Sequence, residues 1–168
     1  TQHTNAKYLP NTTLPMNLVA TASLQQAVDE SDMIVVAVPT KAIRSVCQQF
    51  VPFMREEKLF VHVSKGIEPD SLKRISDLLA EEIPSTLRSD IVVLSGPSHA
   101  EEVVLQHPTT VTVACENMRA AERVQDAFMS SYFRVYTLED VIGAEIGGAL
   151  KNVIALAAGA VDGLGYGD

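Results

Sequence analysis

Residues 33–38 have the sequence MIVVAV, an unbroken run of apolar and mostly β-branched side chains. Such a run is typical of a strand that is covered on both faces, because no position is reserved for solvent. A second strand is predicted over residues 59–64, LFVHVS, and a helical pattern separates the two. Strands that alternate with helices indicate βαβ units and a mostly parallel sheet.

The same alternation extends outward in both directions, after a polar, turn-rich segment at residues 1–17. The carboxyl ends of parallel strands share one edge of a sheet, and open α/β sheets bind ligands there. The pattern predicts further strands over residues 18–21, 91–94, 109–114 and 133–136, and helices over residues 23–30, 40–50, 70–82, 98–105 and 119–130.

From residue 138 the pattern changes to one long helical candidate, residues 139–161, without proline and almost wholly apolar after Glu145. We therefore divide the chain into an α/β unit, residues 1–137, and the start of a second, helical unit, residues 138–168. A helix that is apolar all round is expected to be buried. An unpaired buried ammonium is costly, so Lys151 is expected at a wet cleft or at the edge of the helix.

The composition excludes several classes of protein. The chain has 168 residues, 46% of them hydrophobic, which is enough to bury a core. The net charge is -8 with no block of Lys or Arg, so neither nucleic acid nor an anionic membrane surface is an expected partner. The apolar run at residues 153–161 is too short to span a membrane. Cys47 and Cys115 lie in apolar stretches, which predicts buried, reduced thiols and a reducing compartment.

Two segments that follow predicted strands are candidate ligand sites. Lys65 comes directly after the strand that ends near residue 63, and Gly66 lets the chain turn away, which places the lysine at the ligand edge. An ordinary loop lysine is the alternative. In SGPSHAE, residues 95–101, Gly96 allows close approach to the backbone, and the next helix begins with free N–H groups that suit an anion. Ser98 and Glu101 also fit a capping box, which explains both without a ligand.

A third candidate site is Lys151 with Asn152, which follow Gly147 and Gly148 in the long helix. The glycines would let another segment pack closely against this turn. The histidines and cysteines show no metal-ligand spacing, so no metal is expected. The sequence also contains no G-x-G-x-x-G, the phosphate-binding turn of dinucleotide folds.

Several blocks together resemble the bacterial NAD(P)-dependent glycerol-3-phosphate dehydrogenases. That family has a Rossmann domain followed by an all-helical substrate domain, and it interconverts sn-glycerol 3-phosphate and dihydroxyacetone phosphate for phospholipid synthesis in the cytoplasm. The blocks are YLPNTTLP at 8–15, VSKGIE at 63–68, LSGPSHAEEV at 94–103, FRVYT at 133–137, GGALKNVIALAAG at 147–159 and DGLGYGD at 162–168.

The resemblance covers the central part of the family's sequence. The phosphate-binding turn would precede Thr1 and most of the helical domain would follow Asp168, so a partial Rossmann domain is expected, and the chain by itself is expected to be inactive. In the Rossmann strand order, the strand at residues 33–38 would then have an open edge. We expect self-association there, or N-terminal residues that shield it.

The resemblance also implies roles for individual residues. Lys65 would touch both cofactor and substrate, and Ala100 the cofactor. Gly96, Ser98 and Asn152 would contact the substrate. Lys151 would bind the substrate and act as the catalytic lysine. The implied cofactor is NAD or NADP, and the implied partner is a small phosphate-bearing substrate. The oligomeric state is left open, with a homo-oligomer as one option.

In the implied reaction, hydride leaves C2 of glycerol 3-phosphate for the nicotinamide. Lys151 takes the proton of the C2 hydroxyl, or stays charged and stabilises negative charge on O2. Two alternatives remain open. One is a related two-domain dehydrogenase for another 2-hydroxy compound, and the other is a non-catalytic α/β module that binds a phosphate ligand or a partner. Turnover of a panel of alcohols with NAD and NADP discriminates among them.

Overall fold

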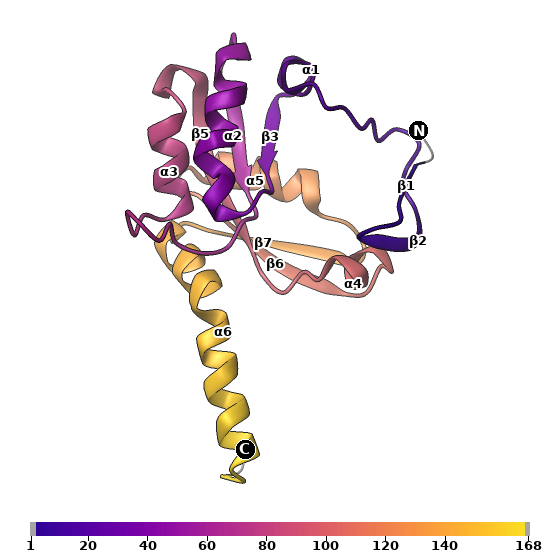
Figure 1. Cartoon of the computed structure of the whole chain (residues 1–168), viewed down its shortest axis with the longest axis vertical. Coiled ribbons are helices and arrows are strands. Elements are labelled where there is room, and N and C mark those ends of the chain that lie inside the picture. The colour runs from indigo at the N-terminus through magenta and orange to yellow at the C-terminus, as the bar shows by residue number, and fades with distance from the viewer. Residues whose placement is uncertain (1–2, 167–168) are drawn as a thin grey trace.

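The computed structural model describes residues 3–166 and contains a five-stranded sheet flanked by helices (Figure 1). The strands follow one another in sequence order, and only the β5–β6 pair is antiparallel. The predicted α/β class with a mostly parallel sheet is therefore confirmed. The strands are β3 (Met33–Val36), β4 (Lys58–His62), β5 (Arg88–Ser95), β6 (Thr109–Ala114) and β7 (Phe133–Leu138).

Each predicted helix is present, with bounds shifted by a few residues. The helices are α1 (Leu24–Asp29), α2 (Ile43–Phe50), α3 (Ile75–Glu82), α4 (Ala100–Val104), α5 (Met118–Phe128) and α6 (Val141–Gly163), with short 3-10 turns η1 (Thr40–Ala42), η2 (Val51–Phe53) and η3 (Ser85–Leu87). Helix α3 begins five residues later than the predicted residue 70.

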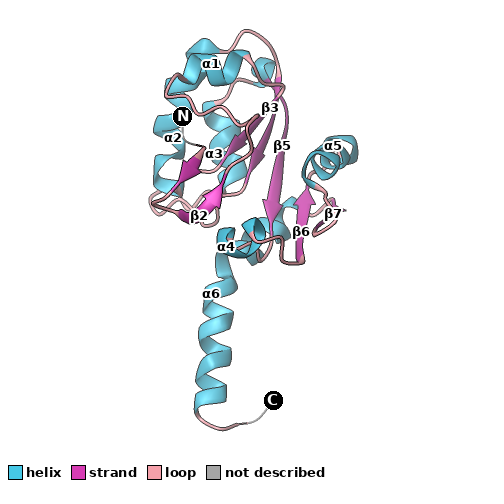
Figure 2. Cartoon of the chain, turned by 90° about the vertical axis from the view of Figure 1, so that its right-hand side faces the viewer, coloured by secondary structure: helices cyan, strands magenta, loops and turns pink. Residues whose placement is uncertain are grey.

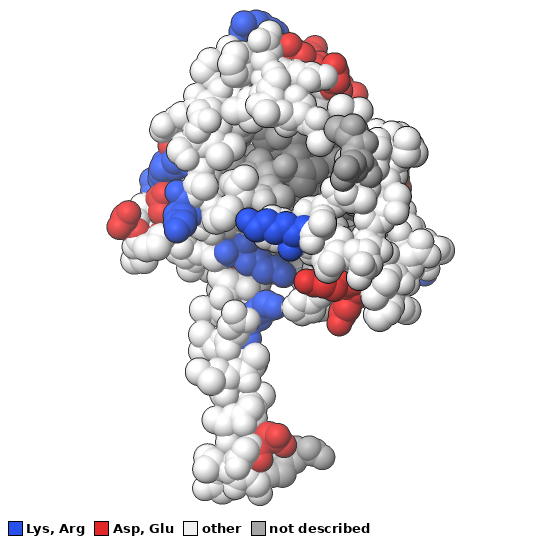
Figure 3. All heavy atoms as spheres, turned by 45° about the vertical axis from the view of Figure 1, so that its right-hand side comes forward, with Lys and Arg blue, Asp and Glu red and all other residues white. Residues whose placement is uncertain are grey.

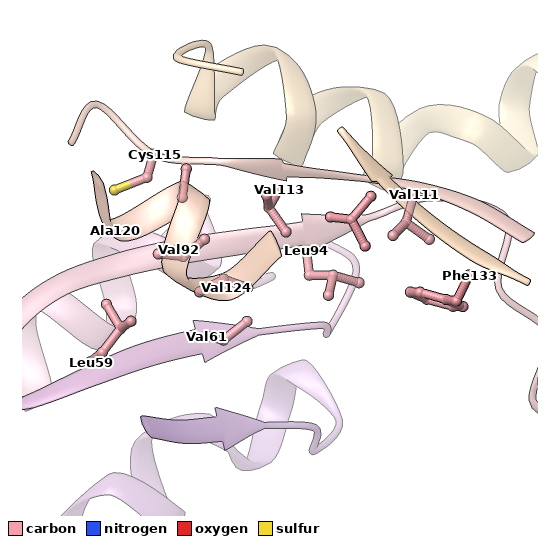
Figure 4. Close-up of a cluster of buried hydrophobic side chains, with 12 residues drawn as sticks. Leu59, Val61, Val92, Leu94, Val111, Val113, Cys115, Ala120, Val124 and Phe133 are labelled. Carbon is pink, nitrogen blue, oxygen red and sulfur yellow. The ribbon is translucent and has the colours of Figure 1, made fainter. Parts of the chain in front are cut away.

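The two faces of the sheet carry separate hydrophobic cores, because successive side chains of a strand point to opposite faces. On one face, Phe60 of β4 packs with the apolar sides of α1, α2 and α3. On the other, Leu59 and Val61 of the same strand pack with β5, β6, β7 and α5. Figure 4 shows this second core, including Val92 and Leu94. Cys47 and Cys115 are buried and unpaired, as predicted.

The N-terminal segment departs from the prediction. The strand predicted at residues 18–21 is wrong: these residues have no regular structure, and Leu18 and Val19 are exposed. Instead, β1 (Thr4–Asn5) and β2 (Leu9–Thr13) form a small antiparallel sheet of their own. They pair with each other rather than with β3, so within residues 3–166 the N-terminal segment does not shield that strand.

Strand β3 lies at the edge of the sheet, with β4 as its neighbour. The prediction that it is covered on both faces is wrong, because Val35 is 43% exposed. Its neighbour β4 is buried at all five positions. Strand β3 therefore has one partly exposed face and, within the described residues, one neighbouring strand.

Helix α6 leaves the α/β body and extends away from it (Figure 2). The expectation that this helix is buried is wrong, because Glu145 is its one buried residue in the described chain and many apolar side chains face solvent. By length and composition alone, the 23 residues of α6 could also cross a membrane. The sequence argument expected no membrane span, because it considered only the shorter apolar run at residues 153–161. The boundary at residue 137 stays a prediction.

Candidate functional site

Lys65 lies where β4 and β5 end at the carboxyl edge of the sheet. Its Nζ donates a hydrogen bond to the carbonyl oxygen of Gly96 over 2.9 Å, which links the loops after the two strands. The Lys65 carbonyl accepts a hydrogen bond from Thr40 Oγ1 over 3.1 Å. Ser64 Oγ donates to the carbonyl of Val38 over 2.6 Å. The loop that carries Lys65 is therefore tied to the ends of both neighbouring strands.

Gly96 meets a steric requirement of the fold. Its φ is +155°, and a Cβ atom there would lie 2.8 Å from Val111 Cα and 3.0 Å from the carbonyl oxygen of Thr110. Both are backbone atoms of β6, which cannot move without disturbing the sheet. The sequence argument attributed this glycine to close approach of a ligand, whereas in the structure β6 approaches it.

Helix α6 brings Lys151 toward Lys65. A Cβ atom on Gly148 would lie 2.8 Å from Ser95 Oγ and 3.9 Å from Lys65 Cγ, so the helix passes directly over the ends of β4 and β5. Burial and the nearby positive charge of Lys151 both lower the pKa of Lys65. The two ammonium groups repel each other, and an anion bound between them would offset that repulsion.

Basic side chains gather on this part of the surface. Figure 3 shows Lys and Arg residues clustered below a hollow, across the junction between the α/β body and α6. Lys151 and Asn152 are exposed on the helix, which agrees with the wet position expected for Lys151. The protein carries a net charge of -8, so a few basic side chains gathered at one place are suited to a small anionic molecule rather than to a polyanion.

Ser98 and Ala100 lie beside the lysine site rather than in it. They line a largely apolar cavity of about 500 Å³ together with Val63 and Phe133. A smaller cavity of about 220 Å³ lies by Lys65 and Thr40, and Val63 lines both. The two cavities thus share Val63 in their linings, one being largely apolar and the other lined by Lys65.

The capping box predicted for Ser98 and Glu101 is wrong. Helix α4 begins at Ala100, so His99 is the N-cap residue and no side chain caps the helix. Ser98 is one position too early to accept the N–H bonds that a cap requires. Ser98 is therefore a lining residue of the cavity without a capping role.

Sequence reasoning missed the ion cluster around Glu145. The Glu145 carboxylate, from α6, lies against Arg74 and Ser76 at the start of α3 and against His62 of β4. A signal was available, since Glu145 is the last acidic residue before a long apolar run and a buried carboxylate needs a cationic partner. Among residues 3–166, no three His, Cys, Asp or Glu side chains are grouped so that they could hold a metal ion.

Comparison with known families gives two matches. The family model described as the NAD-dependent glycerol-3-phosphate dehydrogenase N-terminus matches residues 1–121, and the model of the C-terminus matches residues 140–168. Helix α6 lies wholly within the second match.

Individual relatives agree with the family models. Glycerol-3-phosphate dehydrogenase [NAD(P)+] of Lysinibacillus sphaericus is 67% identical over 99% of this chain and 49% of its own length. The Bacillus subtilis enzyme of that name is 63% identical over 99% and 48%. The chain thus spans about half the length of these curated relatives.

Solved structures show the same fold. The glycerol-3-phosphate dehydrogenase of Saccharomyces cerevisiae has a TM-score of 0.86 at 35% identity, and the match covers 100% of this chain and 50% of that one. The Coxiella burnetii enzyme has a TM-score of 0.86 at 30% identity, with 99% and 50% covered. This chain belongs to the NAD-dependent glycerol-3-phosphate dehydrogenase family.

Proposed function

We propose that this chain forms part of an oxidoreductase that interconverts sn-glycerol 3-phosphate and dihydroxyacetone phosphate with NAD or NADP. The observation that carries the proposal is the pair of ammonium groups, Lys65 and Lys151, at the carboxyl edge of the sheet. Lys65 is held there by its bond to Gly96, and Lys151 is near enough to lower its pKa. A substrate that carries a phosphate matches this charge.

The residues present fit part of a dinucleotide site. The cavity by Lys65 and Thr40 shares Val63 with the largely apolar cavity of Ser98 and Ala100, and we propose that the apolar one takes an uncharged ring and the other a charged group. When bound, the nicotinamide would supply the acceptor for the hydride of C2, and would return it in the reductive direction. The residues that would hold it here are Lys65 and Ala100.

The chain's own residues would serve binding and proton transfer. Lys65 pairs with an anionic group and, through its bond to Gly96, keeps a fixed place between two strand ends. Gly96, Ser98 and Asn152 are further proposed substrate contacts. Lys151 removes the proton of the C2 hydroxyl during oxidation and returns it during reduction. If it stays charged, it stabilises the negative charge that develops on O2.

The exposed helix α6 fits the same proposal. Its apolar surface is assigned to packing within the second domain, which the match of residues 140–168 to the C-terminal family model supports over a membrane span. A cytoplasmic location is part of the proposal, and the two unpaired, buried thiols of Cys47 and Cys115 support a reducing compartment. A homo-oligomer stays a prediction.

The test is a scan of alcohols with the full-length protein, in which NAD or NADP reduction is followed by absorbance. Turnover with glycerol 3-phosphate, and none with other 2-hydroxy compounds, supports the proposal. Turnover only with a different alcohol favours the related dehydrogenase. Phosphate binding without turnover of any alcohol favours the non-catalytic module.

A further inference from the structure

Glu145 attaches α6 to the α/β body. Its Oε1 accepts a hydrogen bond from the backbone N–H of Ser76 over 2.8 Å. Its Oε2 accepts from Ser76 Oγ over 2.6 Å and from Arg74 Nη1 over 2.9 Å. His62 Nε2 lies 3.2 Å from Oε1, at ion-pair distance but without hydrogen-bond alignment. One side chain of the helix thus reaches both α3 and the end of β4.

The carboxylate is held in its charged form despite its burial. The side chain is only 4% exposed, and burial by itself would raise its pKa. The adjacent His62 ring and the two bonds from Ser76 outweigh that effect, so that the pKa of Glu145 is lowered. Loss of this charge would leave the Arg74 guanidinium without one of its two carboxylate partners, the other being Asp77.

The position of Glu145 on the helix sets which face turns toward the sheet. With 3.6 residues per turn, Gly148 and Asn152 lie on the same side of the helix as Glu145, and Lys151 lies at the border of that side. Gly148 faces Ser95, since a Cβ atom there would lie 2.8 Å from Ser95 Oγ, and the cavity left between helix and sheet measures only about 10 Å³. The helix therefore has little room to rotate while Glu145 keeps its partners.

We propose that Glu145 is a positioning residue, which fixes the rotation and the height of α6 so that Lys151 stays beside Lys65. The two lysines come from different parts of the chain, the loop after β4 and helix α6, and no hydrogen bond joins them among the described residues. Their relative placement depends on how α6 packs on the α/β body, and among the described residues Glu145 is the side chain of α6 that hydrogen-bonds to that body, through Arg74 and Ser76. The effect on catalysis rests on the proposed function, whereas the effect on lysine placement does not.

The test compares the full-length wild type with Glu145→Gln, Glu145→Ala and the control Glu139→Gln. Glu139 is exposed and lies just before the same helix, so its loss removes a charge without removing the attachment. We expect kcat to fall about 10- to 100-fold in Glu145→Ala, on the scale of a small misplacement of a catalytic group. The fall is expected to be smaller in Glu145→Gln, whose amide oxygen still accepts from Ser76. The KM for the cofactor and the activity of the control are expected to stay unchanged.

A second readout does not depend on turnover. A short amine-reactive cross-linker is applied, and the yield of the Lys65–Lys151 cross-link is measured by mass spectrometry of the peptides. We expect a strong decrease in Glu145→Ala at a temperature where circular dichroism shows it folded. Unchanged kcat and unchanged cross-linking, with only a lower Tm, would overturn the proposal. If the wild type turns over no glycerol 3-phosphate, the proposed function fails, and the cross-link yield still decides the placement.

Discussion

Replacement of Gly96 by alanine is expected to destabilise the protein strongly. The new Cβ would lie 2.8 Å from Val111 Cα, 2.9 Å from Val111 Cγ1 and 3.0 Å from the Thr110 carbonyl oxygen. Backbone strain at a φ of +155° contributes about 1–3 kcal/mol, and overpacking against β6 about 1–3 kcal/mol more. We therefore expect a loss of at least about 2 kcal/mol in the free energy of unfolding.

The assay is equilibrium urea unfolding followed by circular dichroism, with two comparisons. Gly147→Ala is the matched control, because its Cβ would meet no described atom within 4 Å, and it should change stability by less than about 1 kcal/mol. Because Val111 is itself buried, the double variant Gly96→Ala with Val111→Ala is compared with Val111→Ala alone. The double variant removes the Cγ1 contact but keeps both backbone contacts, so the loss caused by Gly96→Ala should be only slightly smaller in that background. Equal stabilities of Gly96→Ala and Gly147→Ala would refute the steric argument.

Four further predictions concern catalysis, binding, pH and association. Lys151→Ala should lower kcat by about 100-fold or more with the cofactor KM nearly unchanged, and retained turnover with a normal pH profile would contradict this role. Lys65→Ala should raise the KM for substrate or cofactor and change Tm little. A large fall in Tm with an unchanged KM would show that Lys65 has a structural role instead. The pKa of Glu68 is lowered to about 2 by its hydrogen bonds with Arg44 and Ser71, and that of Glu145 is lowered as well, so both stabilise the fold above the ordinary carboxyl pKa. That stability should be lost as pH falls from about 4.5 through the lowered pKa values. Because Gln does not titrate, the Tm of Glu68→Gln should fall less steeply with decreasing pH than the Tm of the wild type. The 168-residue chain alone should be inactive, bind NADH weakly and self-associate in sedimentation through the open edge of β3, and Val35→Lys should reduce that association; micromolar NADH binding by a monodisperse monomer would contradict this prediction.

The α/β class was predictable from the sequence because local patterns carry it. Apolar β-branched runs such as MIVVAV, which indicate strands, alternate with segments whose apolar residues have helical spacing. Each segment indicates its own structure without reference to distant residues. The position of a strand within the sheet is a different matter, since it depends on pairing between distant segments. For that reason the pattern identified β3 as a strand but gave its burial wrongly, and it predicted a strand at residues 18–21, which pair with no strand within residues 3–166.

The candidate site was only partly predictable. Lys65 follows a strand, and Lys151 stands alone in an apolar helix, so both could be found from their surroundings in the sequence. The attachment through Glu145 could not, because Arg74, Ser76 and His62 are about 70 to 80 positions away from it and come together only through tertiary packing. The exposure of α6 was also unpredictable, since an apolar helix has the same pattern whether its covering partner is present or absent.

The two cores on opposite faces of the sheet are connected through shared strands, which links their unfolding. Leu59 and Val61 serve one core, and Phe60, between them, serves the other. Strand β5 shows the same division, with Val92 in one core and Ile91 against the other. Unfolding of either core would therefore disrupt strands that also carry side chains of the other core. The helices on the two faces, far apart in sequence, are therefore expected to lose protection from hydrogen exchange as a single cooperative unit.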